Sequence, residues 1–351
     1  MKNTKRIIST LLAAILVVCS FAALVSCGTE KDGNADGGKL SGDFIFTTGG
    51  PQGTYYGFTQ AVTAKLTESI DGCKFTAVTS GGSKANIEAI ADGDAQFAIV
   101  QNDVMINAYN GVENFVDNKI QDFTVIGAVY PEVCQIIARK GITSIEELKG
   151  KNVSIGAQGS GVVTNSTQIL ALHGITLDDI TVHNLDSGAS ASALQEGKID
   201  AFFFTGGVPT PAMQQLATST EITFLSLADD KVAALKEASP FYVDVQVTHD
   251  IYDFIPEGEI VNAVAVTATY IVSNDVDEEV AYAVTKALWE KQAEIAAVHN
   301  TGKSMKIEAA LLGMDNVPTN EGAIRYYEEY LEQYNADNGT DLTFDQFYYG
   351  K

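Results

Sequence analysis

The chain has 351 residues and a formal net charge of −23 at neutral pH, from 45 acidic and 22 basic side chains. This charge argues against binding to nucleic acids and against a basic face that would bind a membrane surface. The length exceeds what one hydrophobic core usually serves, so two domains are expected.

The N-terminus has the pattern of an export signal. Lys2, Lys5 and Arg6 precede an apolar stretch over residues 7–18, which is too short for a lasting membrane span. Small residues then lead to Cys27, as in a bacterial lipoprotein signal, although an ordinary signal peptide with an incidental cysteine is the alternative. We predict a signal peptide over 1–26 and a flexible tether over 27–42. Cys27 would carry the lipid that anchors an exported protein to the outer face of the cell membrane.

Strands and helices alternate along the rest of the chain. Residues 44–48 predict a strand, and apolar residues at four-residue spacing from Phe58 to Ile70 predict the helix that follows. The cycle repeats to Val100, and a long apolar strand region covers residues 123–140. A second strand–helix series follows, after which a strand from Val261 rejoins the first series and helices over 277–298 and near 322–334 close the fold.

This alternation predicts an α/β fold with two lobes, in which each lobe is a mainly parallel sheet flanked by helices. We assign residues 43–140 and 260–351 to lobe 1 and residues 141–259 to lobe 2. Ligands of open parallel sheets bind beyond the carboxyl ends of the strands, so we expect a ligand cleft between the lobes, as in periplasmic binding proteins.

Three turns rich in glycine and hydroxyl groups fall where the first strands should end, over residues 47–57, 79–86 and 100–103. Backbone N–H groups at the start of a helix are unpaired and carry partial positive charge, so such turns can hold an anion. The chain has only three arginines, Arg6, Arg139 and Arg325, and none lies in these turns. An anion held here would therefore depend on helix starts and hydroxyls rather than on a salt bridge.

Five segments in order resemble the TAXI-type receptors, the extracytoplasmic solute-binding subunits of TRAP transporters. They are TTGGPQGTYYGF, TSGGSKAN, VQND, GAQGSG and FFFTGGVPTP, and Pro51 and Val162 depart from the family pattern. The resemblance implies a receptor that delivers a small carboxylate, glutamate-like or 2-oxoglutarate-like, to TRAP-type permease subunits in the membrane. An ABC-type substrate-binding lipoprotein and a ligand sensor for a membrane kinase are alternatives with the same lobes.

The residues predicted to bind the ligand lie in these turns, because turns from both lobes would face the cleft. They are Thr48, Gly49, Gly50, Gly53, Thr54, Tyr55, Tyr56, Ser80, Gly81, Gly82, Ser83, Asn86, Gln101, Gln158, Gly159, Ser160, Gly161, Phe204, Gly206 and Pro209. The sequence contains no GxSxG, P-loop, GxGxxG or metal-ligand spacing, so we predict no catalytic residue, no metal and no cofactor. Whether Cys73 and Cys134 form a disulfide is left open.

Overall fold

The computed structural model of the protein describes residues 39–314 and 317–351. The predicted signal peptide, the lipidation site Cys27 and residues 27–38 of the predicted tether lie outside this part of the chain. Among the described residues we find no helix whose length and apolar character would let it span a membrane. Cys73 and Cys134 are both buried, and each is a free thiol.

Ten strands of the described residues form one mixed sheet in the order β2-β1-β3-β10-β4-β7-β5-β6, with β9 paired to β10 and β8 paired to β4. The strands are β1 (Gly42–Thr47), β2 (Cys73–Val78), β3 (Phe97–Gln101), β4 (Phe123–Arg139), β5 (Asn152–Ser154), β6 (Thr181–His183), β7 (Ala201–Gly206), β8 (Ile222–Phe224), β9 (Val243–Thr248) and β10 (Ile260–Ser273). Strands β1, β2 and β3 are parallel to one another, and so are β5, β6 and β7. The long strands β4 and β10 run antiparallel to their neighbours.

Helices connect the strands and close the fold after β10. They are α1 (Thr54–Ser69), α2 (Ser83–Ala91), α3 (Asn102–Asn110), α4 (Val162–Leu172), α5 (Ser187–Gln195), α6 (Pro211–Ala217), α7 (Asp229–Ala238), α8 (Glu278–Glu290), α9 (Gln292–Val298) and α10 (Glu321–Asn338). The one helix predicted over 277–298 is in fact two, because α8 ends at Glu290 and the backbone of the next residue, Lys291, leaves the helical conformation. Asp277 begins α8 by accepting a hydrogen bond from the N–H of Glu279 at 2.9 Å.

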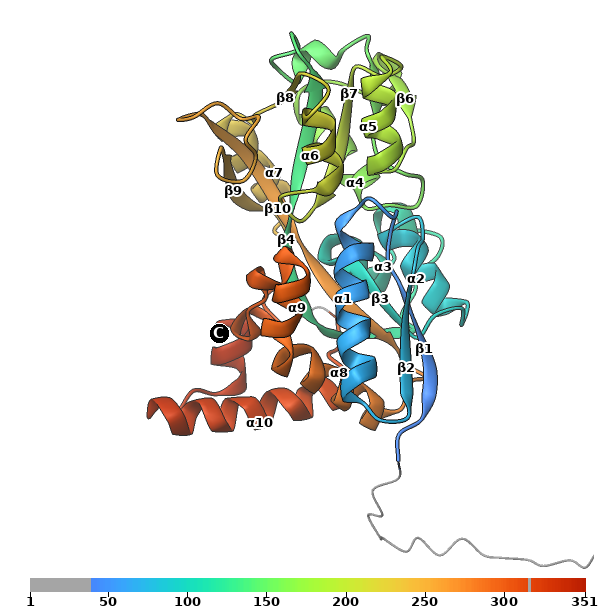
Figure 1. The fold of residues 1–351 in the computed structure, drawn as a ribbon, viewed down its shortest axis with the longest axis vertical. Helices are drawn as coiled ribbons and strands as arrows, with labels where there is room; N and C mark the ends of the chain where they lie inside the picture. The colour runs from blue at the N-terminus through green and yellow to red at the C-terminus, as the bar shows by residue number, and fades with distance from the viewer. Residues whose placement is uncertain (1–38, 315–316) are drawn as a thin grey trace, which may run out of the picture. The chain divides into compact units, whose positions relative to one another are not determined.

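Strands β4 and β10 pass from one hydrophobic core to another (Figure 1). The first core includes β4 as far as Tyr130 and β10 from Ala268 onward, while β4 from Val133 packs in the other cores. The register pairs Pro131 with Thr267 at this change. In the sequence, Pro131 and Glu132 interrupt the apolar run of β4 at this crossing. We therefore propose the boundary between the lobes at this crossing, rather than at residues 140 and 260 as expected from the sequence.

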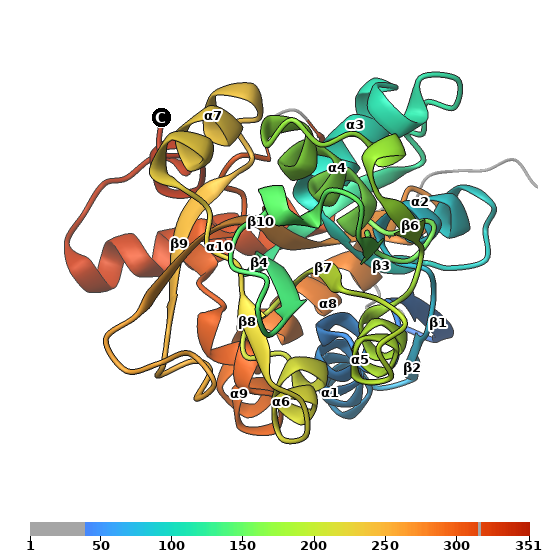
Figure 2. The same cartoon turned by 90° about the horizontal axis from the view of Figure 1, so that it is seen from above.

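The second lobe buries both faces of its part of the sheet. Cys134 and Ile136 of β4 pack in one core with α4 and α7, whereas Val133 and Ile137 point to the opposite core with α5 and α6. Figure 2 shows these helix pairs on the two sides of the strands. Alternate residues of one strand thus enter different cores, as the two-residue period of a strand requires. The predicted two-lobed α/β architecture is confirmed.

Candidate ligand-binding cleft

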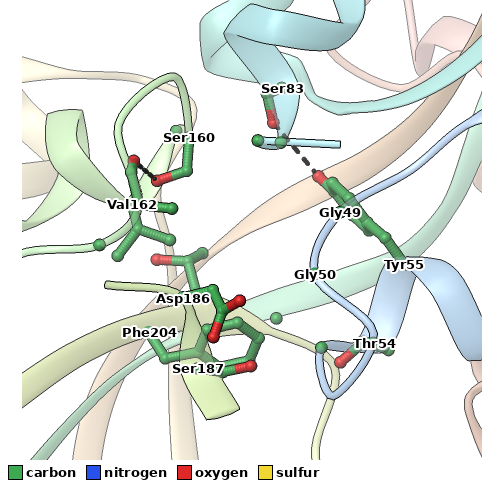
Figure 3. A pocket seen from close by; sticks show the side chains of 18 of the residues that line it. Gly49, Gly50, Thr54, Tyr55, Ser83, Ser160, Val162, Asp186, Ser187 and Phe204 are labelled. Carbon is green, nitrogen blue, oxygen red and sulfur yellow. Dashed lines mark hydrogen bonds between the residues drawn. The ribbon is translucent and has the colours of Figure 1, made fainter. Parts of the chain in front are cut away.

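A cleft lies where the loops of the two lobes meet (Figure 3). Its cavity volume is about 70 Å³, which is smaller than that of typical small-molecule sites, roughly 300–1,000 Å³. Its first-lobe wall consists of the turns after β1 and β2 and the end of β3, and its second-lobe wall of the loops after β5 and β6 and the end of β7. The lining residues are Gly49, Gly50, Gly53, Thr54, Tyr55, Ser80, Gly81, Gly82, Ser83, Gln101, Glu132, Gly156, Ala157, Ser160, Gly161, Val162, Leu185, Asp186, Ser187, Phe203, Phe204, Thr205 and Gly206.

The two first-lobe turns are tight, and the second of them needs glycine. In the turn after β1, the N–H of Gly53 donates to the carbonyl of Gly50 at 3.0 Å, and α1 begins at the next residue. In the turn after β2, Gly82 has φ of +109°, a conformation that other residues rarely adopt. A Cβ on Gly82 would also lie 3.1 Å from the Cα of Ser160 in the opposite lobe. This turn therefore needs glycine both for its own backbone and for the approach of the second lobe.

The lobes touch across the cleft through main-chain hydrogen bonds. The N–H groups of Lys84 and Ala85, in the first turn of α2, donate to the carbonyl of Gly159 at 3.0 and 3.2 Å. The amide of Asn165 on α4 also donates to a carboxyl oxygen of Asp103 on α3 at 2.9 Å. Two N–H groups at the start of α2 are thus used for contact between the lobes. These two N–H groups are therefore not available to a ligand in this arrangement.

A chain of hydrogen bonds links the polar groups of the first-lobe wall. The hydroxyl of Tyr55 donates to Oε2 of Glu132 at 2.7 Å and lies 3.5 Å from Oγ of Ser83. That Oγ in turn accepts the N–H of Gln101 at 3.0 Å. Figure 3 shows Tyr55 and Ser83 facing each other, with Asp186, Ser187 and Phe204 on the opposite wall.

Glu132 is the buried acid of the cleft. Its side chain is 1% exposed, and burial raises the pKa of its carboxyl well above the usual range. The nearby charge of Asp103 raises this pKa further, whereas the hydrogen bond from Tyr55 lowers it. Among the described residues that line the cleft there is no lysine, arginine or histidine. The cleft therefore offers carboxyl groups, hydroxyls and backbone groups, but no cationic side chain.

Gln101 carries an unused hydrogen-bond acceptor in the cleft. Every residue of β3 is buried, so the strand delivers Gln101 into the interior at its carboxyl end. The side chain is 2% exposed, and its Oε1 has no hydrogen-bond partner. This oxygen lies against Gly161 of the second lobe, so closely that a Cβ at that position would overlap it. A buried acceptor without a donor is costly, which makes Oε1 a place where a ligand donor would fit.

Several predicted site residues do not line the cleft. They are Thr48, Tyr56, Asn86, Gln158, Gly159 and Pro209. Thr48 and Asn86 instead join strand ends, because the Thr48 hydroxyl donates to the carbonyl of Val78 and the Asn86 amide donates to the carbonyls of Thr48 and Ile99. Gly159 meets the first lobe through its carbonyl group. The other predicted residues do line the cleft. Contact of any predicted residue with a ligand remains a prediction.

The sequence analysis did not include two acidic residues of the cleft. Asp186 lies in the turn after β6, which ends at His183, and begins α5 by accepting the N–H of Ala189 at 2.8 Å. The rule applied to the other strand ends would therefore have found it. For Glu132, the sequence gives a weaker indication of a place in the cleft. It is the one acidic residue within the apolar strand β4, and its place in the cleft depends on where that strand crosses between the lobes.

A family comparison identifies the chain. The model of the NMT1-like family matches residues 46–330, which is most of the chain. The protein belongs to the NMT1-like family. The TAXI-type resemblance is corrected accordingly: the family assignment, the TRAP permease and the dicarboxylate ligand that the resemblance implied are withdrawn in favour of this match.

Several solved structures match this NMT1-like protein at low identity. A protein from Bordetella bronchiseptica RB50 matches at 17% identity with a TM-score of 0.51, over 82% of this chain and 98% of that one. The alkanesulfonate-binding protein SsuA from Xanthomonas axonopodis pv. citri, bound to MOPS, matches at 14% identity with a TM-score of 0.47, over 81% of this chain and 82% of that one. A third match comes from Methylobacillus flagellatus KT and is described as the periplasmic sulfonate-binding protein SsuA of a putative sulfonate ABC transporter. It matches at 13% identity with a TM-score of 0.43, over 88% of this chain and 91% of that one. The predicted periplasmic-binding-protein-like fold is confirmed.

Gly161→Ala should prevent full closure of the NMT1-like protein. The added Cβ would overlap Oε1 of Gln101 in the other lobe. Overpacking of this kind should destabilise the arrangement in which the lobes touch by about 1–3 kcal/mol. We expect a larger radius of gyration for the ligand-free variant in small-angle X-ray scattering. Gly49→Ala is the matched control, because its Cβ would meet nothing closer than 3.5 Å. Identical scattering from Gly161→Ala and the original protein would contradict this prediction.

Asp103→Asn should change how stability depends on pH. Burial raises the pKa of Asp103 from 3.8 to about 6. When the pKa of a carboxyl is higher in the folded than in the unfolded state, the protein loses stability as the pH rises from the unfolded-state pKa to the folded-state pKa. Asparagine does not titrate, so the variant lacks this loss. Relative to the original protein, we expect the unfolding free energy of the variant to rise by up to about 3 kcal/mol between pH 4 and pH 7. Urea unfolding at several pH values tests this, and a difference that stays constant with pH would refute it.

Proposed function

We propose that this protein is the solute-binding protein of an ABC-type importer and that it captures a small polar organic solute in the cleft. The observation that carries the proposal is a cleft whose walls come from both lobes, with backbone hydrogen bonds between the lobes beside it. Such a cleft surrounds a ligand from two sides, and closure of the lobes around it is a common way for two-lobed receptors to bind.

The chemistry of the lining supports binding rather than catalysis. The hydroxyl of Ser160 donates to the carbonyl of Ala157 at 2.7 Å, and Ser83 accepts a backbone N–H, so neither is paired with a general base. No described lining residue is a histidine or a cysteine. We therefore propose a receptor without catalytic activity.

The choice of transporter follows from the alternatives that the sequence left open. With the TRAP assignment withdrawn, an ABC-type binding lipoprotein and a sensor for a membrane kinase remain. We propose the first. Cross-linking of the protein to its membrane partner in the native cell decides between them: a permease with a P-loop ATPase subunit supports the importer, and a membrane kinase overturns it.

Binding of a solute should stabilise the protein with one-to-one stoichiometry. We expect a rise in melting temperature with at least one compound from a panel of amino acids, amines, carboxylates and sulfonates, since a ligand at a hundred times its Kd adds about 2.7 kcal/mol. The protein is unfolded and refolded first, so that no co-purified solute remains, and calorimetry then gives the stoichiometry.

Two tryptophan variants test whether the cleft is the site. Ala157→Trp should fill the cleft and abolish the response, whereas Ala171→Trp, on the exposed face of α4, should preserve it. A panel without any response, or a response that Ala157→Trp leaves intact, would refute binding in this cleft.

We further propose that the protein is exported and anchored through Cys27, as the pattern of its first 27 residues indicates. Cys27→Ser should remove the lipid attachment site and move the protein from the membrane fraction to the soluble exported fraction. Cys19→Ser, within the predicted signal peptide, is the control that should leave the protein on the membrane. Fractionation and labelling with a radioactive fatty acid measure the outcome, and a Cys27→Ser protein that still takes up label would exclude this anchor.

A further inference from the structure

The cleft presents hydrogen-bond acceptors and acidic groups without any cation to balance them. Glu132 lies at its floor and Asp186 on the second-lobe wall, while the described lining residues include no basic side chain. Asp186 uses one carboxyl oxygen to accept the N–H of Ala189, and the other lies beside Gly50 across the cleft. A carboxylate ligand would therefore meet two acids of the same sign and no positive partner.

Glu132 is incompletely paired for a buried acid. It forms no ion pair with any described residue, and its one hydrogen bond comes from the uncharged hydroxyl of Tyr55. Taking an ionised carboxylate out of water is costly unless a charge and further hydrogen bonds replace the water. A positive group in the cleft would supply both.

Gln101 gives a second, independent indication. Its buried Oε1 has no donor in the protein. The backbone N–H of the same residue bonds to Oγ of Ser83, which lies beside Tyr55, the hydrogen-bond partner of Glu132. An amide oxygen and a carboxylate are both acceptors, and an ammonium group has three donors. One group on the ligand could thus satisfy both residues.

We infer that the solute bound in this cleft carries a protonated amino group, and that Glu132 and Gln101 bind that group. The inference rests on the proposed solute-binding function and specifies the class of ligand. An inorganic cation fits less well. A calcium ion takes about six to eight oxygen ligands, whereas no group of three His, Cys, Asp or Glu side chains among the described residues could hold a metal ion.

Binding of an ammonium group at Glu132 should release a proton. The titratable groups that face Glu132 are Tyr55 on α1, Asp103 on α3, and Tyr130 and Cys134 on its own strand, and none is cationic. Burial raises the pKa of Glu132, so the empty cleft favours the protonated carboxyl and an ammonium favours the ionised one. Affinity for such a ligand should therefore fall as the pH is lowered, and a ligand without a basic nitrogen should show no such loss.

Matched pairs of compounds test the inference by calorimetry. Each pair consists of an amine and its analogue without the amino group: L-alanine and propanoate, 4-aminobutanoate and butanoate, and taurine and ethanesulfonate. Whichever compound of the wider panel binds is tested beside its own deaminated analogue. We expect the analogue to bind at least about a hundredfold more weakly, because it leaves the buried acid unpaired. Titrations in buffers of different ionisation enthalpy should show proton release with the amine alone.

Glu132→Gln tests the residue itself. Glutamine keeps the size of the side chain and an acceptor for the Tyr55 hydroxyl but loses the charge, so we expect affinity for the amine to fall by at least about a hundredfold and proton release to disappear. The melting temperature of the ligand-free variant should not fall, which separates lost binding from lost folding. Glu279→Gln removes the same charge from the surface of α8 and should leave binding unchanged.

The outcomes separate this inference from the proposed function. A ligand without a basic nitrogen, or an amine whose affinity survives Glu132→Gln, overturns the inference and leaves the solute-binding function intact. Failure of every compound in the panel to bind the original protein overturns the proposed function and the inference with it.

Discussion

The antiparallel pairing of β4 with β10 is the constraint on which the rest of the structure depends. Both lobes build their cores onto these two strands, and the ladder between them continues through the crossing at Pro131 and Thr267. The two lobes are therefore joined through a pair of continuous strands. Glu132 follows Pro131 directly. The buried acid thus lies at the crossing itself, where it also lines the cleft.

The charge of the cleft reverses what its turns suggest. Helix starts rich in glycine and hydroxyl groups are a known means of holding anions, and those at the starts of α1 and α2 have this form. The structure assigns two N–H groups of α2 to the carbonyl of Gly159 and places Glu132 and Asp186 beside these turns. The net charge of −23 acts in the same direction, because a negative surface potential attracts cations and repels anions.

Much of the cleft could be predicted from sequence, because parallel strands bring the turns at their carboxyl ends to one edge. Gly49, Ser83, Gln101 and Ser160 were predicted on that basis, and all line the cleft. Other features depend on packing that no local pattern encodes. Asn86 resembles a ligand contact in sequence, yet its amide bonds two strand ends.

The lobe boundary and the last helices differ in what the sequence shows. Pro131 and Glu132 interrupt the apolar run of β4 at the crossing, where we propose that one lobe ends. The break between α8 and α9 falls at Lys291, where no glycine or proline announces it. The main-chain contacts between α2 and Gly159 have a wider consequence. These contacts use backbone groups, which do not depend on the identity of the side chains. Substitutions in the cleft can therefore change which solute is bound without changing how the lobes meet. Relatives with different solutes could share one mode of closure.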